Sequence, residues 1–322
     1  MLRACGLGIT GLTGIACAYP AGSFADRHNA RDILLALTII RAIDLIGFCF
    51  VSGPVSLLAA SFVVLGTQSA VAGMRVALVC GLFPSERRQI DILAKLRALS
   101  HVSYAAGASL GAVVLGYNDL VGFYVGLLLN AATFFIFTII IVLPPKDNPI
   151  EKISIEGDIR VLHDFPYLTI MGVTMLFALC WSPMSTALPL WVHQRTTAPQ
   201  YLPGLPLAAF SLLIAFFQVQ VSKKTQSVGG GGQASLLTGW ILGGRCILFA
   251  SSGYASPILA SILLIAGTLF VIAGEIYFIA GKWILSIVLM NKEFKGRYQG
   301  VTSSLETMIT AVGPAFMSLV VI

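Results

Sequence analysis

Residues 120–143 read LVGFYVGLLLNAATFFIFTIIIVL, an apolar run without a single Asp, Glu, Lys or Arg. A helix of about twenty such residues crosses a hydrocarbon core of about 30 Å. Comparable runs recur along the chain, in which 57% of the 322 residues are hydrophobic and only 11% are charged. Because about a quarter of the residues in a soluble domain are charged, this composition excludes a soluble protein and predicts an all-α polytopic membrane protein.

Hydropathy predicts ten membrane-spanning segments. They are residues 3–21, 33–52, 54–82, 98–116, 120–143, 166–190, 203–222, 234–253, 256–289 and 300–322. The first is apolar and Gly-rich and further spans follow at once, unlike a cleaved signal peptide. If alternate loops are cytoplasmic, fourteen Lys and Arg residues lie on that side, against Arg3 and Arg195 on the other. The positive-inside rule then predicts that both chain ends lie outside the cytoplasm. We expect a multi-pass protein of the plasma (inner) membrane.

A polar stretch between the fifth and sixth spans divides the chain into halves. It runs from Pro144 to Asp164 and carries three prolines and charges of both signs. We therefore predict an N-terminal bundle of five spans over residues 1–143, a cytoplasmic linker over 144–165 and a C-terminal bundle of five spans over 166–322. A weak internal likeness between residues 82–111 and 290–313 supports this division into two halves. Such parallel repeats are typical of transporters.

Several other classes of function find no support in the sequence. The net charge of +6 comes from basic residues scattered among short loops, so we expect no nucleic-acid partner. The six cysteines form no CxxC pair, so neither a disulfide framework nor a metal site is predicted, and we expect no cofactor. The expression G-x-S-x-G occurs around Ser109, but His101 lies on the same predicted span and no other histidine lies within a span. We therefore do not expect an enzyme.

The most specific motif is GSFADRHNAR at residues 22–31, in the cytoplasmic turn after the first span. It resembles the G-x-L-A-D-R-x-G-R-R signature of Major Facilitator Superfamily transporters, and the matching residues are Gly22, Ala25, Asp26, Arg27 and Arg31. The resemblance implies two helical bundles that rock about a central cavity, with these residues forming a latch that closes the cytoplasmic side. Asp26 is suited to cap the helix that follows it or to pair with a neighbouring basic residue. A plain basic turn is the alternative.

A second glycine motif lies in residues 107–116. It resembles the G-x-x-x-G-P-x-x-G-G pattern in the fifth helix of proton-linked exporters: Gly107, Gly111 and Gly116 match, whereas Ala112 and Leu115 depart from it. Gly313 and Pro314 resemble a helix-packing motif in the tenth-to-eleventh helix region of bacterial members of the same family. The resemblance implies that the chain belongs to a drug-exporter-like bacterial branch of the family. It also implies that this sequence lacks the first and last of the family's twelve helices. Ordinary packing of small residues is the alternative.

Charged residues inside the spans are the candidate coupling residues, because each costs about 2.5–3.5 kcal/mol on insertion scales. Arg41 and Asp44 are three residues apart on one helical face and are expected either to pair or to line the cavity. Glu275 and Lys282 are seven apart, too far for easy pairing. We expect them either to face the cavity, where Glu275 could exchange a proton with a cationic substrate, or to belong to a structural network.

Two further glycine patterns predict a helix-packing stripe and a flexible connector. Gly267, Gly274 and Gly281 repeat every seven residues and predict a stripe at which another helix packs closely. Their segment, 256–289, is about 50 Å long as a helix and must tilt, break or project from the membrane. The run Gly229–Gly232 predicts a flexible connector.

Together these features predict a monomeric secondary transporter that works by alternating access. Its expected partners are a small-molecule substrate, protons and the lipid bilayer. The family resemblance favours proton-coupled efflux of amphipathic compounds. A nutrient importer of the same fold and a degenerate membrane protein that no longer transports are the alternatives. No dedicated motif identifies the substrate.

Overall fold

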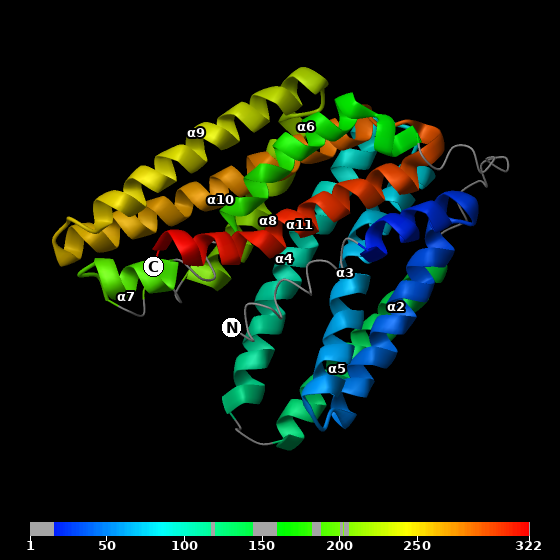
Figure 1. Cartoon of the computed structure of the whole chain (residues 1–322), viewed down its shortest axis with the longest axis horizontal. Helices are drawn as coiled ribbons and strands as arrows, with labels where there is room; N and C mark the ends of the chain where they lie inside the picture. The colour runs from blue at the N-terminus through cyan, green and yellow to red at the C-terminus, as the bar shows by residue number, and fades with distance from the viewer. Residues whose placement is uncertain are drawn as a thin grey trace. The chain divides into compact units, whose positions relative to one another are not determined.

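The computed structural model describes residues 16–116, 120–143, 160–181, 188–199, 202 and 206–321, which form helices and no strand. An N-terminal helix is described over residues 16–27. The remaining helices and 3-10 turns are α2 (Ala30–Gly47), η1 (Phe48–Phe50), α3 (Pro54–Leu82), α4 (Glu86–Gly116), α5 (Leu120–Val142), η3 (Arg160–His163), α6 (Phe165–Leu176), η4 (Phe177–Cys180), α7 (Leu188–Arg195), α8 (Pro206–Lys224), α9 (Val228–Ser252), α10 (Pro257–Val288), η6 (Lys292–Phe294) and α11 (Lys295–Val321) (Figure 1).

Five helical segments of the described chain are long and apolar enough to cross a membrane. They are α2 with η1, α3, α5, α9 and α10, and the shorter apolar segment Phe165–Cys180 joins them. Large apolar side chains stand exposed on these helices, among them Phe123, Ile139 and Trp240. Such side chains suit a surface covered by lipid. The predicted all-helical membrane fold is therefore confirmed.

Two helices differ from the predicted spans. Helix α4 begins at Glu86, well before residue 98, so Arg97 lies on a helix and not in a loop. The predicted span 166–190 is not one helix, because α6 ends at Leu176 and passes into a 3-10 turn, and α7 begins at Leu188. Pro189 lies in the first turn of α7, where its missing N–H leaves no helical hydrogen bond unmade.

The run Gly229–Gly232 is not a flexible connector but the first turn of α9. Ser227 caps this turn, since its side chain accepts the Gly230 N–H at 3.0 Å. A Cβ at Gly231 would lie 3.2 Å from Leu285 on α10 and still closer to Ile284. The absence of side chains therefore lets α9 begin directly against α10, which compensates for the low helix propensity of glycine.

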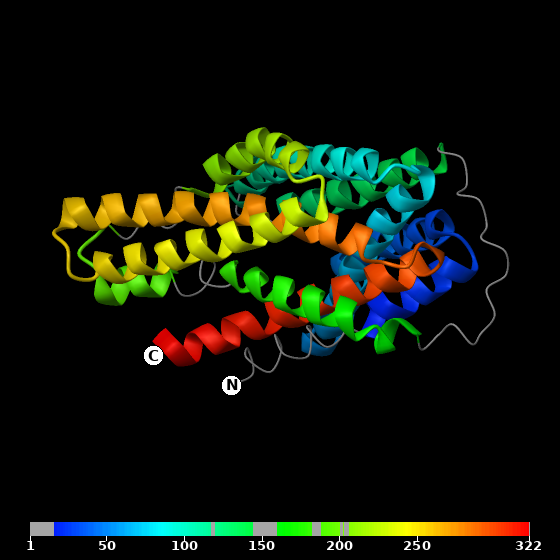
Figure 2. The same ribbon diagram turned by 90° about the horizontal axis from the view of Figure 1, so that it is seen from above.

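The seven-residue glycine repeat of α10 also faces α9. A Cβ at Gly274 would lie 2.7 Å from the Leu242 side chain, and one at Gly281 would lie 3.1 Å from Ser235. The predicted role in close helix packing is confirmed for this stripe. Figure 2 shows α9 and α10 running side by side, and α10 is one unbroken helix of 32 residues.

The described chain packs as two units, each drawn from separate stretches of sequence. Unit 1 comprises Met1–Pro84, Ser109–Leu168 and Leu289–Ala311, and unit 2 comprises Ser85–Ala108, Thr169–Val288 and Val312–Ile322. The first part of α11 thus packs with the N-terminal helices, and the first part of α4 packs with α8 to α10. The two bundles at residues 1–143 and 166–322 stay a prediction.

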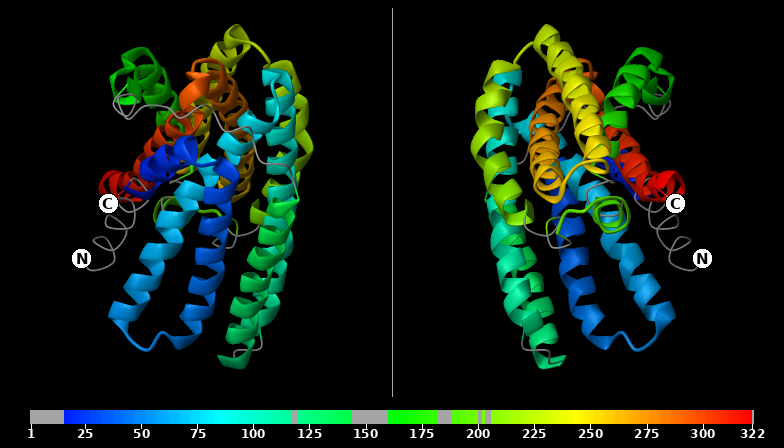
Figure 3. Two further views of the ribbon diagram at one scale, coloured as in Figure 1. Left: turned by 90° about the vertical axis from the view of Figure 1, so that its right-hand side faces the viewer. Right: turned by 90° about the vertical axis from the view of Figure 1, so that its left-hand side faces the viewer.

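The core of unit 1 joins the N-terminal helix to α2, α3 and α5. It is formed by small and medium apolar side chains, namely Ala21, Ala25, Ala30, Leu34, Ala70, Met74, Ala77, Leu78 and Ile141. Helix α2 packs against both α3 and α5, and Figure 3 shows α2 and α3 leaving the short turn that joins them. The many alanines let the helices approach closely, as membrane helices do.

Unit 2 contains two smaller apolar clusters around α10. Ile214 of α8 packs against Ile272 and Ile276, while Leu188 and Val192 of α7 pack near Ala260 and Leu264. The first half of α10 still exposes Ile258, Ile262 and Ile265, whereas most of its second half is buried. The site residues on α10 are consequently held on a well-fixed helix.

Candidate functional site

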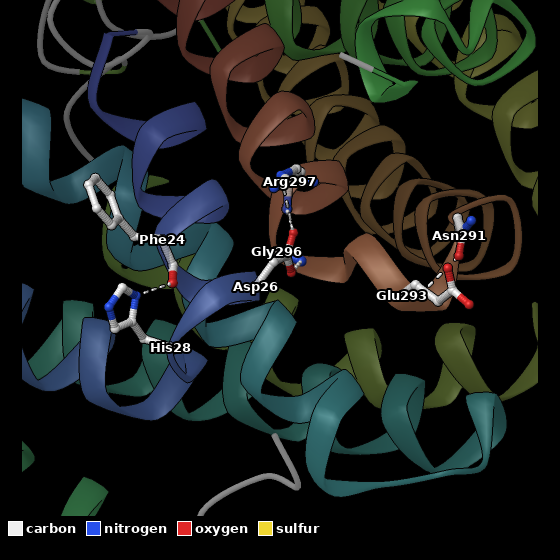
Figure 4. A network of polar contacts seen from close by, with 7 residues as sticks. All are labelled: Phe24, Asp26, His28, Asn291, Glu293, Gly296 and Arg297. Atoms are coloured by element: carbon white, nitrogen blue, oxygen red, sulfur yellow. Dashed lines mark hydrogen bonds and ion pairs between the residues drawn. The ribbon is translucent and has the colours of Figure 1, made fainter. Parts of the chain in front are cut away.

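The carboxylate of Asp26 binds the N-terminus of α11 (Figure 4). Its Oδ1 accepts the Gly296 N–H at 2.6 Å and its Oδ2 accepts the Arg297 N–H at 2.9 Å. The first N–H groups of a helix have no partner within the helix, and the helix dipole favours a negative charge there. Asp26, from the opposite end of the sequence, therefore caps α11. We call Asp26, Gly296 and Arg297 the latch.

The latch is shielded from water. The side chains of Asp26 and Arg297 are each 1% exposed, and Arg297 Nε lies 3.9 Å from Asp26 Oδ2. Burial raises the pKa of the Asp26 carboxyl to about 6, although the N–H donors of Arg297 and Gly296 and the charges of Arg297 and Lys295 act in the opposite direction. The guanidinium of Arg297 also lies over the Phe294 ring, 5.1 Å from its centroid.

Glycines allow the N-terminal helix and α11 to meet at the latch. A Cβ at Gly22 would lie 2.8 Å from the carbonyl carbon of Gly296, and one at Gly296 would lie 2.6 Å from Asp26 Oδ1. One turn further along α11, a Cβ at Gly300 would lie 2.7 Å from the Ala18 carbonyl oxygen. Since these neighbours are backbone or latch atoms, a larger residue would push the helices apart.

The other signature residues have separate positions. Ala25 is buried in the core of unit 1. Arg31 donates from Nε to the Ile141 carbonyl at 3.1 Å and from Nη2 to the Val142 carbonyl, so it caps the C-terminus of α5. Arg27 is exposed at the end of its helix. The predicted latch role thus falls to Gly22 and Asp26 by position, and stays a proposal.

A tyrosine pair adjoins the latch in unit 1, and the sequence analysis did not find it. Tyr298 donates its hydroxyl to Asp164 Oδ2 at 2.7 Å, while the Tyr167 hydroxyl lies 2.6 Å from Thr302 Oγ1. The two rings meet edge to face with centroids 4.6 Å apart. These contacts fasten the start of α6 to α11. Neutral tyrosines near the ends of predicted spans follow no motif, so the sequence carries no signal for this pair.

An ion pair in unit 2 joins α4 to α10. Arg97 Nη2 donates to Glu275 Oε1, and the two side chains are 20% and 13% exposed. Sequence reasoning selected Glu275 but missed its partner, because Arg97 was assigned to a loop. Glu275 therefore takes part in an ion pair, in which the positive charge of Arg97 balances its carboxylate.

The remaining charged candidates have aromatic or apolar surroundings. The Arg41 guanidinium lies over the Phe134 ring at 4.8 Å, and Lys282 Nζ lies 5.7 Å from the Phe278 centroid. Asp44 Oδ2 is buried and accepts no hydrogen bond from the described residues. A role for these three in coupling stays a prediction.

The second glycine motif is only partly informative. A Cβ at Gly107 or Gly111 would meet no atom of the described chain within 4 Å, so a packing role stays a prediction. Gly116 ends α4, and Gly313 and Pro314 lie within α11. The G-x-S-x-G run also lies in α4, so His101 and Ser109 are roughly 12 Å apart along one helix axis and form no catalytic pair. No group of three or more His, Cys, Asp or Glu able to hold a metal occurs among the described residues.

Comparison with known proteins identifies the family. The family model described as Major Facilitator Superfamily matches residues 6–318. A comparison with curated proteins gives no match.

Solved structures of transporters share the fold. The human organic anion transporter MFSD10 (TETRAN) has a TM-score of 0.67 and 17% identity, over 98% of this chain and 76% of that one. A bacterial homologue of the iron transporter ferroportin, in an outward-facing state, has a TM-score of 0.73 and 16% identity, over 99% and 84%. The nucleoside transporter NupG has a TM-score of 0.55 and 14% identity, over 99% and 83%. At these identities the likeness supports the fold alone.

Proposed function

The chain belongs to the Major Facilitator Superfamily, and from that membership we propose that it exports a small amphipathic solute by alternating access, driven by protons. In alternating access a midplane site opens to one side of the membrane at a time, so contacts between helices must form and break in each cycle. The latch and the Arg97–Glu275 ion pair are our candidates for such contacts. Similar structures include an organic anion transporter, a bacterial homologue of an iron transporter and a nucleoside transporter, so the fold does not define the solute.

The latch is the observation that carries the proposal. Asp26 lies near the start of the chain and Gly296 and Arg297 near its end, yet one buried carboxylate binds both backbone N–H groups. An anion at a helix N-terminus stabilises by up to about 2 kcal/mol in partly buried sites. Both hydrogen bonds are lost together if α11 moves away. These properties support a gate that is either formed or broken.

Glu275 is the residue we assign to proton coupling. A proton on its carboxylate would remove the charge that holds Arg97. A buried charge that loses its partner destabilises its surroundings by about 3–5 kcal/mol. Protonation of Glu275 would therefore favour another arrangement of α4 and α10, which links proton uptake to helix movement.

Proton movement in proteoliposomes tests this assignment. Vesicles loaded with the pH dye pyranine would receive ethidium, Nile red or carboxyfluorescein as cationic, neutral and anionic probes. We expect at least one probe to change the internal pH with the native chain and to lose that effect with Glu275→Gln. Asp44→Asn is tested in parallel as the other candidate, and Glu293→Gln, at an exposed acid of η6, is the matched control. An unchanged pH response with Glu275→Gln would remove the assignment.

Uptake together with a proton is the second candidate function, and the charges near Glu275 favour it. Glu275, Arg245 and Arg97 all lie within electrostatic range of Cys180, so two basic residues accompany one acidic residue there. Protonation of Glu275 would add to this positive charge and strengthen binding of an anion, as cotransport requires. Right-side-out vesicles with an acidic exterior separate the candidates: accumulation of a probe indicates uptake, and loss of a preloaded probe indicates export. Movement in neither direction for any probe would contradict both.

A further inference from the structure

Arg245 of α9 is a buried base without an acidic partner. Its residue surface is 7% exposed. Nη1 donates to the Cys180 carbonyl at 3.2 Å, and Nη2 lies 3.7 Å from Cys246 Sγ. Nε is buried and donates to no atom of the described chain, and no carboxylate of that part of the chain pairs with this guanidinium. Buried charges in membrane proteins normally pair with one another or serve a ligand.

Among the described residues, the acidic residue found near Arg245 is Glu275, and it is already engaged. Glu275 is the sole Asp or Glu between residues 169 and 288, and Arg97 holds it. Cys180, whose carbonyl accepts a hydrogen bond from Arg245, also lies within electrostatic range of Arg97 and Glu275, and its neighbour Trp181 packs on Phe278, one helical turn from Glu275. The two bases and the one acid therefore surround the same point of unit 2 and leave a net positive charge there.

Further polar atoms at this place lack partners. Arg97 Nε is buried without a hydrogen-bond acceptor in the described chain, and so is Nδ1 of His101, one turn along α4 and 9% exposed. Aromatic rings stand beside them, because Trp181 directly follows Cys180 and packs against Phe278 with centroids 5.7 Å apart. The place thus combines unsatisfied donors with apolar rings, as binding sites for amphipathic molecules do.

We propose that Arg245 binds the anionic group of an amphipathic organic anion, and that such an anion is the transported solute. A guanidinium presents a planar fork of donors that matches a carboxylate or sulfonate, and the unused Nε belongs to that fork. Trp181, the partly exposed member of the aromatic pair, receives the apolar part. This inference rests on the proposed function and holds for both directions: a membrane potential that is negative inside drives an anion outward, and a cotransported proton would bring it inward.

Binding of three ring-matched probes tests the charge preference. They are 2-naphthoate, 2-naphthylmethanol and 2-naphthylmethylammonium, titrated by calorimetry against the chain in nanodiscs of zwitterionic lipid. Because a hydrogen bond to a charged group contributes enough to change affinity about tenfold or more, we expect naphthoate to bind about tenfold more tightly than the alcohol. Equal affinity for all three, or preference for the ammonium, would overturn the inference.

Substitutions of Arg245 test whether this residue forms the binding site. Arg245→Gln is expected to lose the preference for naphthoate while it still binds the alcohol, which shows that the variant is folded. Arg245→Lys should keep part of the preference, and Arg195→Gln, at an exposed arginine of α7, should change nothing. Unchanged naphthoate binding by Arg245→Gln would overturn the assignment.

Two further arms separate the remaining outcomes. Nanodiscs with anionic lipid test whether a headgroup phosphate is the occupant, and competition between that lipid and naphthoate at Arg245 would overturn the solute assignment. Vesicle transport separates this inference from the proposed function. If cationic or neutral probes are transported and Arg245→Gln does not change that transport, only the assignment of an anionic solute is refuted. Naphthoate binding with no transport of any probe refutes the proposed function and leaves the site standing.

Discussion

Asp26 is placed so that its protonation state and the latch are linked. In a latch that has opened, water surrounds the carboxyl and its pKa is near the ordinary value of about 3.9, whereas in the formed latch burial raises the pKa to about 6. A raised pKa means that the formed latch binds the proton more tightly. Acid therefore favours the latch, and this advantage is fully present below about pH 4 and lost as the pH rises through 6.

Distances between nitroxide labels at Phe24→Cys and Glu293→Cys would measure this effect. Both positions are exposed. We expect the short-distance population to grow as the pH falls from 7 to 4, and Asp26→Asn to abolish that dependence. His28→Gln, beside the latch (Figure 4), is the control and should retain it. A population that shrinks in acid would contradict the linkage.

Arg31 shows why lysine cannot replace every arginine of the signature. Two of its nitrogens, Nε and Nη2, donate to the carbonyls of Ile141 and Val142 at the C-terminus of α5. Lysine offers a point charge and no planar fork. We expect Arg31→Lys to lose one hydrogen bond and to lower the free energy of unfolding by about 0.5–1.5 kcal/mol. Thermal unfolding in nanodiscs measures this, and Arg27→Lys, at the exposed neighbour, should change stability much less.

The crossing of the N-terminal helix with α11 depends on glycine. Gly22 and Gly300 each face the backbone of the other helix at less than ordinary contact distance, and backbone cannot turn aside as a side chain can. We expect Gly22→Ala to weaken the latch by about 1–3 kcal/mol, seen as a longer label distance at pH 7. Gly107→Ala, where a Cβ meets nothing, is the matched control. An unchanged distance with Gly22→Ala would show that the helices do not separate there.

A disulfide between α3 and α11 tests whether these two helices must separate during transport. Ser69 Oγ lies 2.7 Å from Thr307 Oγ1, a separation that two cysteine sulfurs can bridge with little adjustment. In a background without the six native cysteines, oxidation of Ser69→Cys with Thr307→Cys is expected to stop transport, and reductant to restore it. Ser69→Cys alone and Thr307→Cys alone are the controls, because neither can form the cross-link on oxidation. Full transport by the oxidised pair would mean that α3 and α11 stay together throughout the cycle.

Much of the architecture follows from local sequence because each local signal has a local cause. A run such as residues 120–143 must be a helix in lipid, since every backbone N–H and C=O there needs a partner within its own segment. Spacing likewise predicts the glycine stripe of α10, because residues seven apart lie on one helical face. The same reasoning fails for Gly229–Gly232, whose low helix propensity is overridden by the Ser227 cap and by packing against Ile284.

Composition, hydropathy and the GSFADRHNAR motif determined the membrane class and the family, because those features are written in consecutive residues, and they made Asp26 and Glu275 candidate site residues. The partners of these acids were decided by tertiary structure. Asp26 caps a helix that begins at Lys295, and Glu275 pairs with Arg97, each across a separation of well over a hundred residues. No periodicity carries such pairings, since they arise only when packing brings distant helices together. The uncompensated charge of Arg245 became visible for the same reason.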